Sequence, residues 1–265
     1  MSQSIGIFDS GLGGCTVAHA IYRLLPKEKL IYFGDTLHFP YGDKAPETII
    51  KYSEEITRFL IKKKSKIVVI ACNTASAHAH EQVKKICEQA GVLAIDVIHP
   101  IAEQIANASY QKIGIIGTRG TIQTQAYDKR IHLLNPNKKI QSLATPLLAP
   151  MVEEGIFNHP ISRLVLQHYL EHSKLKDIEA LVLGCTHYPL LYNDIEAFYD
   201  YKMPILDGAH TVALAVQKLL KENNLLSEHK ESDNEFYISE FTPFFEQSAC
   251  LFFQDKIQLK IAKIS

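Results

Sequence analysis

The stretch IGIFDSGLGG at 5–14 decides the fold, because a second stretch, IGIIGTRGT at 113–121, repeats its pattern. Two further pairs follow in the same order: VVIACNTAS at 68–76 with LVLGCTHYP at 181–189, and AIDVIHP at 94–100 with ILDGAHT at 205–211. We interpret the chain as two similar α/β lobes with a site in the cleft between them. Unrelated α/β units could also share such short patterns, so this alternative stays open.

Short β-branched runs alternate with helical patterns along the chain. Helices are predicted at 46–63, 75–90 and 208–222, where apolar residues recur at helical spacing. Strands are predicted at 5–8, 30–34, 66–71, 93–96, 112–117, 139–143, 180–184 and 203–206. Continuous apolar strands joined by helices predict mostly parallel sheets with helices on both faces. Ligands of such sheets bind beyond the carboxyl ends of the strands, so the residues that follow each apolar run are candidate site residues.

The composition excludes several classes of protein. The chain has 265 residues and a formal net charge of −1, so no basic bias favours nucleic acid or an anionic membrane. Its start lacks the pattern of a signal peptide, and its longest apolar runs are too short to span a membrane. The five cysteines are scattered, odd in number and without a CxxC pair. We therefore expect a reduced, cytoplasmic protein without a disulfide framework.

Two cysteines occupy the same place in the two repeats. Cys72 and Cys185 each follow a strand and precede a predicted helix, whose N-terminus can lower the pKa of a thiol. The alternative is that both simply pack in the core, as buried cysteines usually do. Two thiols facing one carbon could act as opposed proton carriers and invert a stereocentre without a cofactor. Cys15, Cys87 and Cys250 are predicted to pack in the core.

Other polar residues near the strand ends carry weaker signals. The glycine loop at 11–14 does not match a dinucleotide fingerprint, but its backbone N–H groups could bind a carboxylate. Asp9 could meet an ammonium group or a thiol, or it could cap a turn. His187 could tune the proton of Cys185 or cap the following helix. Glu153 could pair with a substrate ammonium group or be solvated in a loop.

Metal and pyridoxal chemistry are not predicted. His78 and His80, together with Cys72, do not form an i, i+4 pair, and the chain has neither an HExxH motif nor a CxxC pair. We expect both histidines to be solvated on a helix. No lysine stands at the strand ends singled out above, where a pyridoxal enzyme would need one for its Schiff base. The expectation is a protein without metal or cofactor.

Four motifs stand in a fixed order along the chain: FDSGLGG at 8–14, GDTLHFPYG at 34–42, ACNTASA at 71–77 and GCTHYPLL at 184–191. Together they resemble the motifs of the glutamate racemases, cofactor-independent enzymes of bacterial cell-wall synthesis, and the likeness covers nearly the whole chain. The resemblance implies that Cys72 and Cys185 are the two acid–base residues. It implies a substrate shell of Asp9, Ser10, Tyr41, Gly42, Asn73, Thr74, Thr186 and His187, with Thr118, Thr121 and Glu153 as looser matches.

The same resemblance implies the architecture and the partners. It implies two pseudo-symmetric lobes, of which the first comprises 1–97 plus 208–265 and the second 98–207, because the end of the chain returns to complete the first lobe. The implied function is interconversion of L- and D-glutamate for peptidoglycan, in the cytoplasm and as a homodimer. Two alternatives remain: a related racemase for another acidic amino acid such as aspartate, or a non-catalytic amino-acid-binding protein whose cysteines belong to the core.

Overall fold

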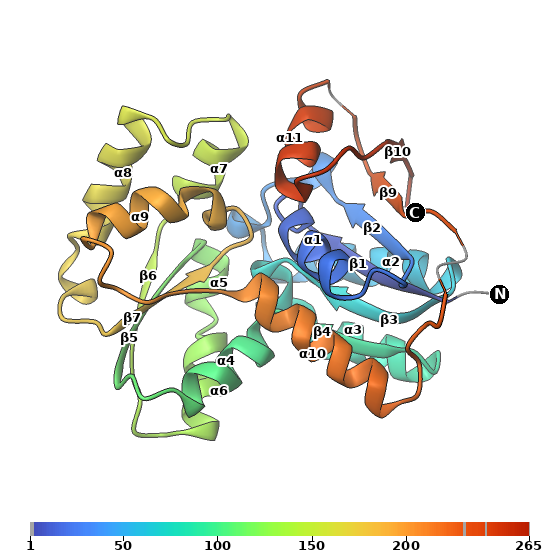
Figure 1. Ribbon diagram of the computed structural model, residues 1–265, viewed down its shortest axis with the longest axis horizontal. Coiled ribbons are helices and arrows are strands. Elements are labelled where there is room, and N and C mark those ends of the chain that lie inside the picture. The colour runs from blue at the N-terminus through green and yellow to red at the C-terminus, as the bar shows by residue number, and fades with distance from the viewer. Residues whose placement is uncertain (1–2, 230–231, 242, 265) are drawn as a thin grey trace.

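Two lobes, each a parallel sheet flanked by helices, lie side by side in the molecule (Figure 1). The computed structural model describes residues 3–229, 232–241 and 243–264. Every strand pairing recorded for these residues is parallel. The predicted fold class, α/β with two lobes of mostly parallel strands, is confirmed.

The first lobe contains a six-stranded sheet with the order β10-β9-β2-β1-β3-β4. Its strands are β1 (Ser4–Asp9), β2 (Leu30–Gly34), β3 (Ser65–Ile70), β4 (Leu93–Asp96), β9 (Glu235–Ile238) and β10 (Leu259–Ile261). The central strand β1 is buried along its whole length, as its continuous apolar run predicts. The prediction contained the first four strands but missed β9 and β10, which are only four and three residues long.

The second lobe contains a four-stranded sheet with the order β6-β5-β7-β8. Its strands are β5 (Lys112–Gly117), β6 (Lys139–Ala144), β7 (Ala180–Gly184) and β8 (Ile205–Asp207). This order matches the β2-β1-β3-β4 part of the first sheet, strand for strand. The repeated sequence segments therefore occupy equivalent strands: β1 with β5, β3 with β7, and β4 with β8. Cys72 and Cys185 accordingly follow equivalent strands of the two lobes.

Helices cover both faces of each sheet. In the first lobe they are α1 (Cys15–Leu24), α2 (Pro46–Lys62), α3 (Asn73–Gln89) and α11 (Pro243–Phe253), with α4 (Ile98–Asn107) and α10 (Gly208–Glu222) at the lobe junction. In the second they are α5 (Arg119–Gln123), α6 (Ala126–Leu134), α7 (Leu148–Glu153), α8 (Pro160–Leu170) and α9 (Tyr192–Phe198). Short 3-10 helices are η1 (Thr36–His38), η2 (Tyr41–Asp43), η3 (Ser173–Leu175) and η4 (Tyr188–Leu191). The three predicted helices correspond to α2, α3 and α10.

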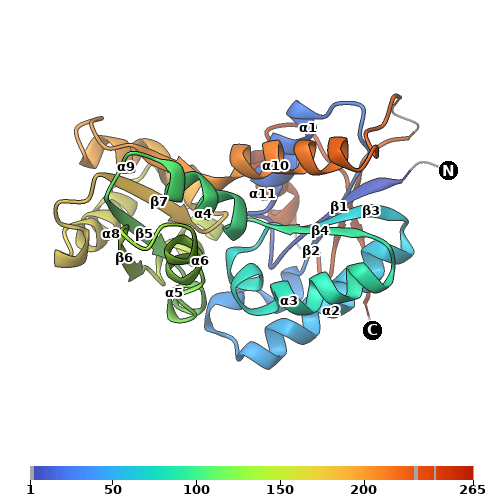
Figure 2. The ribbon, with the colours of Figure 1, turned by 90° about the horizontal axis from the view of Figure 1, so that it is seen from below.

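The first sheet separates two apolar cores. Strand residues alternate between faces, so Ile7 packs toward α1 and α10, whereas Phe8 packs toward α2 and α3. Figure 2 shows α1 and α10 on one side of the sheet and α2 and α3 on the other. Helix α2 begins with Pro46, for which the first helical position is favourable, and it buries an apolar stripe. Burying one large apolar side chain contributes about 1.5–3 kcal/mol to folding.

The chain crosses between the two sheets twice, through α4 after β4 and through α10 after β8. The division into 1–97 plus 208–265 and 98–207 stays a proposal, and these crossings are what supports it. All five cysteines are free thiols; Cys87 is buried, as predicted, whereas Cys250 is only half-buried. Within the part of the chain that the structure describes, no helix is long and apolar enough to cross a membrane.

The prediction for His80 was wrong. We expected a solvated helix histidine, but its side chain is only 17% exposed and it contacts Asp96 at the end of β4. The reason is that α3 packs between α2 and β4, so that two of its faces are covered. His78 is likewise half-buried, and its Nε2 is sealed from solvent. Burial of these rings could not be deduced from their spacing in the sequence.

Candidate active site

One small cavity between the lobes gathers most of the predicted site residues. Its lining includes Ser10, Tyr41, Gly42, Cys72, Asn73, Thr74, Thr118, Cys185, Thr186 and His187. Phe39, Pro40 and Ala149 also line it and were not among the predicted site residues. The cavity volume is about 20 Å³, which is room for about one water molecule. The structure therefore shows a closed cleft, and a ligand the size of an amino acid requires the lobes to part.

The remaining three predicted residues lie directly behind this lining. Asp9 accepts a hydrogen bond from the Thr186 hydroxyl at 3.4 Å and another from the Gly11 backbone N–H at 3.0 Å. Glu153 forms a buried ion pair with His187 Nε2. Thr121 lies 3.2 Å from the Thr74 hydroxyl oxygen. These three residues do not line the cavity themselves. They hold in place the side chains of Thr186, His187 and Thr74, which do.

Cys72 stands at the N-cap of α3, as its place after β3 predicts. Its Sγ accepts the backbone N–H of Ala75 at 3.4 Å and lies 3.5 Å from the Ser10 hydroxyl. Despite these hydrogen bonds, burial and the charge of Asp9 raise the pKa of the Cys72 thiol from 9.0 to about 12. The expectation that the helix N-terminus lowers this pKa was wrong, because desolvation outweighs the helix field. Cys72 is thus a protonated thiol at neutral pH.

Cys185 has a different environment. The expected helix does not follow it directly; only the short 3-10 helix η4 begins three residues later, at Tyr188. Its Sγ instead lies 3.6 Å from Nδ1 of His187. Burial by itself would lower the pKa of His187, but Glu153 and Cys185 together raise it well above 6.5. A charged imidazolium therefore faces the sulfur of Cys185.

Hydrogen bonds join the start of α3 to the second lobe. The Thr74 hydroxyl lies 2.8 Å from the Thr118 hydroxyl, and the Tyr127 hydroxyl donates to Oδ1 of Asn73 at 2.6 Å. Tyr127 is buried on α6, and no motif around it indicated a role at the cleft. Arg119 also reaches across to Asp43, at 3.0 Å on the exposed rim. Polar contacts therefore join the two lobes across the closed cleft.

Tyr41 is held in the cavity wall by a second carboxylate. Its hydroxyl donates to Asp35 at 2.5 Å, and Asp35 also accepts from Ser239 and contacts His38. Asp35 follows β2 directly, so it lies at the same edge of the sheet as the other strand-end residues. Ser239 comes from the segment after β9, so the C-terminal part of the chain supports the wall of the site.

The arrangement places two thiols from equivalent strand ends at one cavity. Cys72 has the Ser10 hydroxyl beside it and lies within the field of Asp9, and Cys185 has a carboxylate–imidazole pair. Around them are hydroxyl and amide groups and the N-terminus of α3, which suit anionic ligands. Chemically, such a site can donate a proton from one side and accept one on the other.

Comparison with known proteins identifies the family. The model of the Asp/Glu/hydantoin racemase family matches residues 14–216. The chain is 40% identical over 242 residues to a glutamate racemase of Geobacter metallireducens, covering 91% of this chain and 88% of the relative. It is 43% identical over 225 residues to one of Chlorobaculum parvum, covering 84% and 82%.

A solved structure agrees over the whole length. The glutamate racemase of Francisella tularensis in complex with D-glutamate superimposes with a TM-score of 0.92 at 36% identity, covering 99% of this chain and 98% of that one. The family match, the sequence relatives and the two-lobed structure thus all point to one kind of isomerase. The chain belongs to the Asp/Glu/hydantoin racemase family.

Proposed function

We propose that this protein interconverts L- and D-glutamate, with Cys72 and Cys185 as the two acid–base residues. The observation that carries the proposal is that both thiols line one cavity from equivalent strand ends of opposite lobes. The substrate assignment is supported by the relatives named glutamate racemase and by the similar structure that contains D-glutamate. A cavity lined by two opposed thiols is not needed by a protein that only binds an amino acid.

The proposed reaction moves one proton off the α-carbon and puts another on. In one direction the Cys185 thiolate takes the α-proton, and the electron pair of the broken C–H bond stays on the substrate as a carbanion delocalised into its carboxylate. The Cys72 thiol then gives its proton to the opposite face, leaving Cys72 as the thiolate and Cys185 as the thiol. The reverse direction uses the same two sulfurs with exchanged roles. No group beyond the two thiols gains or loses a proton overall.

The neighbours of each thiol suit these roles. The His187 imidazolium offsets the negative charge on Cys185 before proton abstraction, and Glu153 holds the ring in place. Ser10, Asn73 and Thr74 supply donors for the substrate carboxylates, and a closed cleft makes such preorganised donors more effective than they are in water. Fixing the substrate between two bases also removes much of the entropic barrier.

The test of this proposal is a racemisation assay with the two acidic amino acids. Loss of the circular dichroism signal of L-glutamate is expected to run to the racemic end point, with L-aspartate slower by about 10–200-fold because it lacks one methylene. Equal or faster turnover of aspartate would favour the alternative racemase. Binding of glutamate without any turnover would favour an amino-acid-binding protein.

A pH dependence follows from the state of Cys72. Because burial and Asp9 raise the pKa of this thiol to about 12, it keeps its proton at pH values where an ordinary cysteine has lost it. In the direction that uses Cys72 as the acid, kcat/KM is expected to be bell-shaped, with an alkaline limb above pH 9.0, the ordinary thiol value. Measuring the profile from both enantiomers checks this. An alkaline limb at or below the ordinary thiol value would contradict the assignment.

Closure of the cleft gives a further prediction at Gly42. A Cβ at this position would lie 2.8 Å from the Cβ of Thr118 in the other lobe, so Gly42→Ala obstructs the closed state. We expect kcat/KM to fall about 10–100-fold, because small misplacements at a site are costly, while the melting temperature stays near that of the wild type. The strain is relieved whenever the lobes part.

A matched variant separates closure from stability. Gly6→Ala places a Cβ 3.0 Å from the Cβ of Ser65 and 3.2 Å from the Cβ of Leu60, inside the first lobe. This change is expected to lower the melting temperature while the folded protein keeps its activity. A Gly42→Ala protein that loses stability but not activity would show that the contact between the lobes is irrelevant to turnover.

The biological setting is proposed from the relatives. We propose that the D-glutamate serves peptidoglycan synthesis, that the enzyme acts in the cytoplasm as a homodimer, and that it needs no cofactor. The named glutamate racemases support the first point. Growth of a D-glutamate auxotroph carrying this chain tests the supply role, and sedimentation of the purified protein tests the dimer. A chain that sediments as a monomer while fully active would remove the dimer from the proposal.

A further inference from the structure

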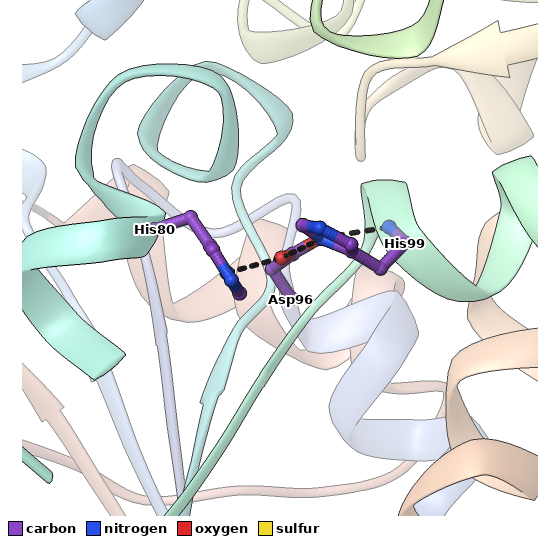
Figure 3. A group of neighbouring side chains, drawn as sticks. All are labelled: His80, Asp96 and His99. Atoms are coloured by element: carbon purple, nitrogen blue, oxygen red, sulfur yellow. Dashed lines mark hydrogen bonds and ion pairs between the residues drawn. The ribbon is translucent and has the colours of Figure 1, made fainter. Parts of the chain in front are cut away.

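Two histidines converge on one carboxylate outside the cavity of the candidate active site. His80 comes from α3, Asp96 is the last residue of β4, and His99 lies in the first turn of α4. Figure 3 shows both rings turned toward Asp96. His99 Nδ1 lies 2.5 Å from Asp96 Oδ2, and His80 Nδ1 contacts the same oxygen. One ligand atom from each of the three residues lies within 4.8 Å of the other two.

The two oxygens of the Asp96 carboxylate have different partners. Asp96 Oδ1 accepts the backbone N–H groups of Ile98 and His99, at 2.6 and 2.9 Å, so this oxygen caps α4. The other oxygen faces both imidazole rings. His80 Nδ1 is sealed from solvent and pairs with Asp96 Oδ2. Two ring nitrogens thus share one carboxylate oxygen, and a cation placed between the three groups would be bound by all of them.

We propose that His80, Asp96 and His99 bind a divalent transition-metal ion of the Zn²⁺, Co²⁺ or Ni²⁺ type. Two imidazole nitrogens and one carboxylate oxygen suit these ions, whereas Mg²⁺ and Ca²⁺ prefer oxygen ligands alone. Three protein ligands leave a position for water. Metal–ligand distances of about 2.0–2.2 Å require the donors to spread by roughly 1 Å from their present contacts. The His99 side chain is 33% exposed, which leaves it room to move.

The surroundings of the cluster provide a path for the ion from the surface and determine which elements a bound ion connects. A groove of about 270 Å³, lined by Ser76, Ile98, His99, Ala126, Lys129 and Arg130, leads to His99 from the surface. The bound ion links α3 and β4 to α4, and α4 packs on α6 and α10 where the chain crosses between the lobes. None of the three ligands lines the cavity that holds Cys72 and Cys185. The ion therefore stabilises the lobe junction and is not needed for proton transfer.

Cobalt titration of the purified, metal-free protein tests the site, because Co²⁺ reports its ligands through visible absorption. The titration is run on the wild type and on a variant with Cys72→Ser and Cys185→Ser, which removes the thiols of the cleft as competing ligands. We expect one Co²⁺ per chain, bands of nitrogen and oxygen ligation without a thiolate charge-transfer band, and a higher melting temperature with the ion. Binding only through a thiolate band, or no binding of one equivalent, would overturn the proposal.

Single substitutions assign the ligands. Losing a residue that only supports a metal ligand costs about 10–100-fold in affinity. His80→Gln and His99→Gln remove a ligand itself, so each is expected to weaken binding at least about 100-fold. Asp96→Asn is expected to do the same while still capping α4, since asparagine is a good N-cap.

The control is His168→Gln, which removes an exposed imidazole on α8 and should leave the affinity unchanged. Metal-free His99→Gln protein should keep the wild-type circular dichroism spectrum and turnover, which shows that the fold is intact. Wild-type affinity in this folded variant would refute the site, whatever the racemase assay gives.

Discussion

Replacing either Cys72 or Cys185 by alanine is expected to abolish racemisation in both directions. Each direction needs one sulfur to take the α-proton and the other to return a proton, so the loss of either thiol stops both. Removing one acid–base group costs about 10²–10⁴-fold in rate. We expect the upper end here, because each direction needs both thiols. The measurement is kcat/KM from L-glutamate and from D-glutamate for each variant.

Matched variants separate chemistry from stability in this experiment. Cys72→Ser keeps an acceptor for the Ala75 N–H at the start of α3, so a loss of activity in a folded serine variant reports on the thiol itself. Cys87→Ala and Cys250→Ala remove thiols outside the cavity and should retain turnover, with a stability loss of a few kcal/mol at most. Substantial racemisation by Cys185→Ala would exclude the mechanism with two thiol bases.

Solvent deuterium is expected to enter the product enantiomer completely from the first turnovers. The enzyme is equilibrated in heavy water and given unlabelled L-glutamate. One thiolate takes the α-hydrogen, and the opposite thiol, already exchanged with solvent, delivers deuterium to the other face. Because each thiol carries a single hydrogen, the abstracting sulfur can return only the original one. Recovered L-glutamate should therefore stay almost unlabelled early in the reaction.

The isotope pattern distinguishes the arrangements of bases. A single base serving both faces would carry some original hydrogen into D-glutamate, and one rapidly exchanging base would label both enantiomers together. Mass analysis of the separated enantiomers at early times decides between them. Early deuterium in recovered L-glutamate would count against two opposed monoprotic bases.

The strands and long helices could be predicted because their signals are local. The predicted strand at 112–117 is β5, and the predicted helix at 208–222 is α10, each within the observed bounds. Strand β9 was missed, since it has four residues and gains its stability by pairing with β2 rather than from an apolar pattern of its own. The helix predicted after Cys185 was wrong for a related reason, because the repeat could not show that only a short 3-10 helix forms there.

The sequence identified most residues of the candidate site, but it could not predict how their surroundings shift their pKa values. Strand-end positions and motifs identified Cys72, Asn73 and Thr186, because the carboxyl ends of parallel strands meet at one edge of a sheet. They could not show that burial raises the pKa of Cys72, since desolvation depends on what covers the sulfur. They also missed Phe39, whose ring lies against His187 and closes the cavity.

The sequence by itself determined the two α/β repeats, the strand-end position of both thiols and the family to which the chain belongs. Tertiary structure alone decided which distant groups meet: Glu153 with His187, 34 residues apart, and Tyr127 with Asn73, 54 residues apart. The physical reason is the distance along the chain over which each kind of interaction acts. Strand and helix signals lie within a few neighbouring residues, whereas burial, ion pairing and proton affinity depend on groups that only the packing of the two lobes brings together.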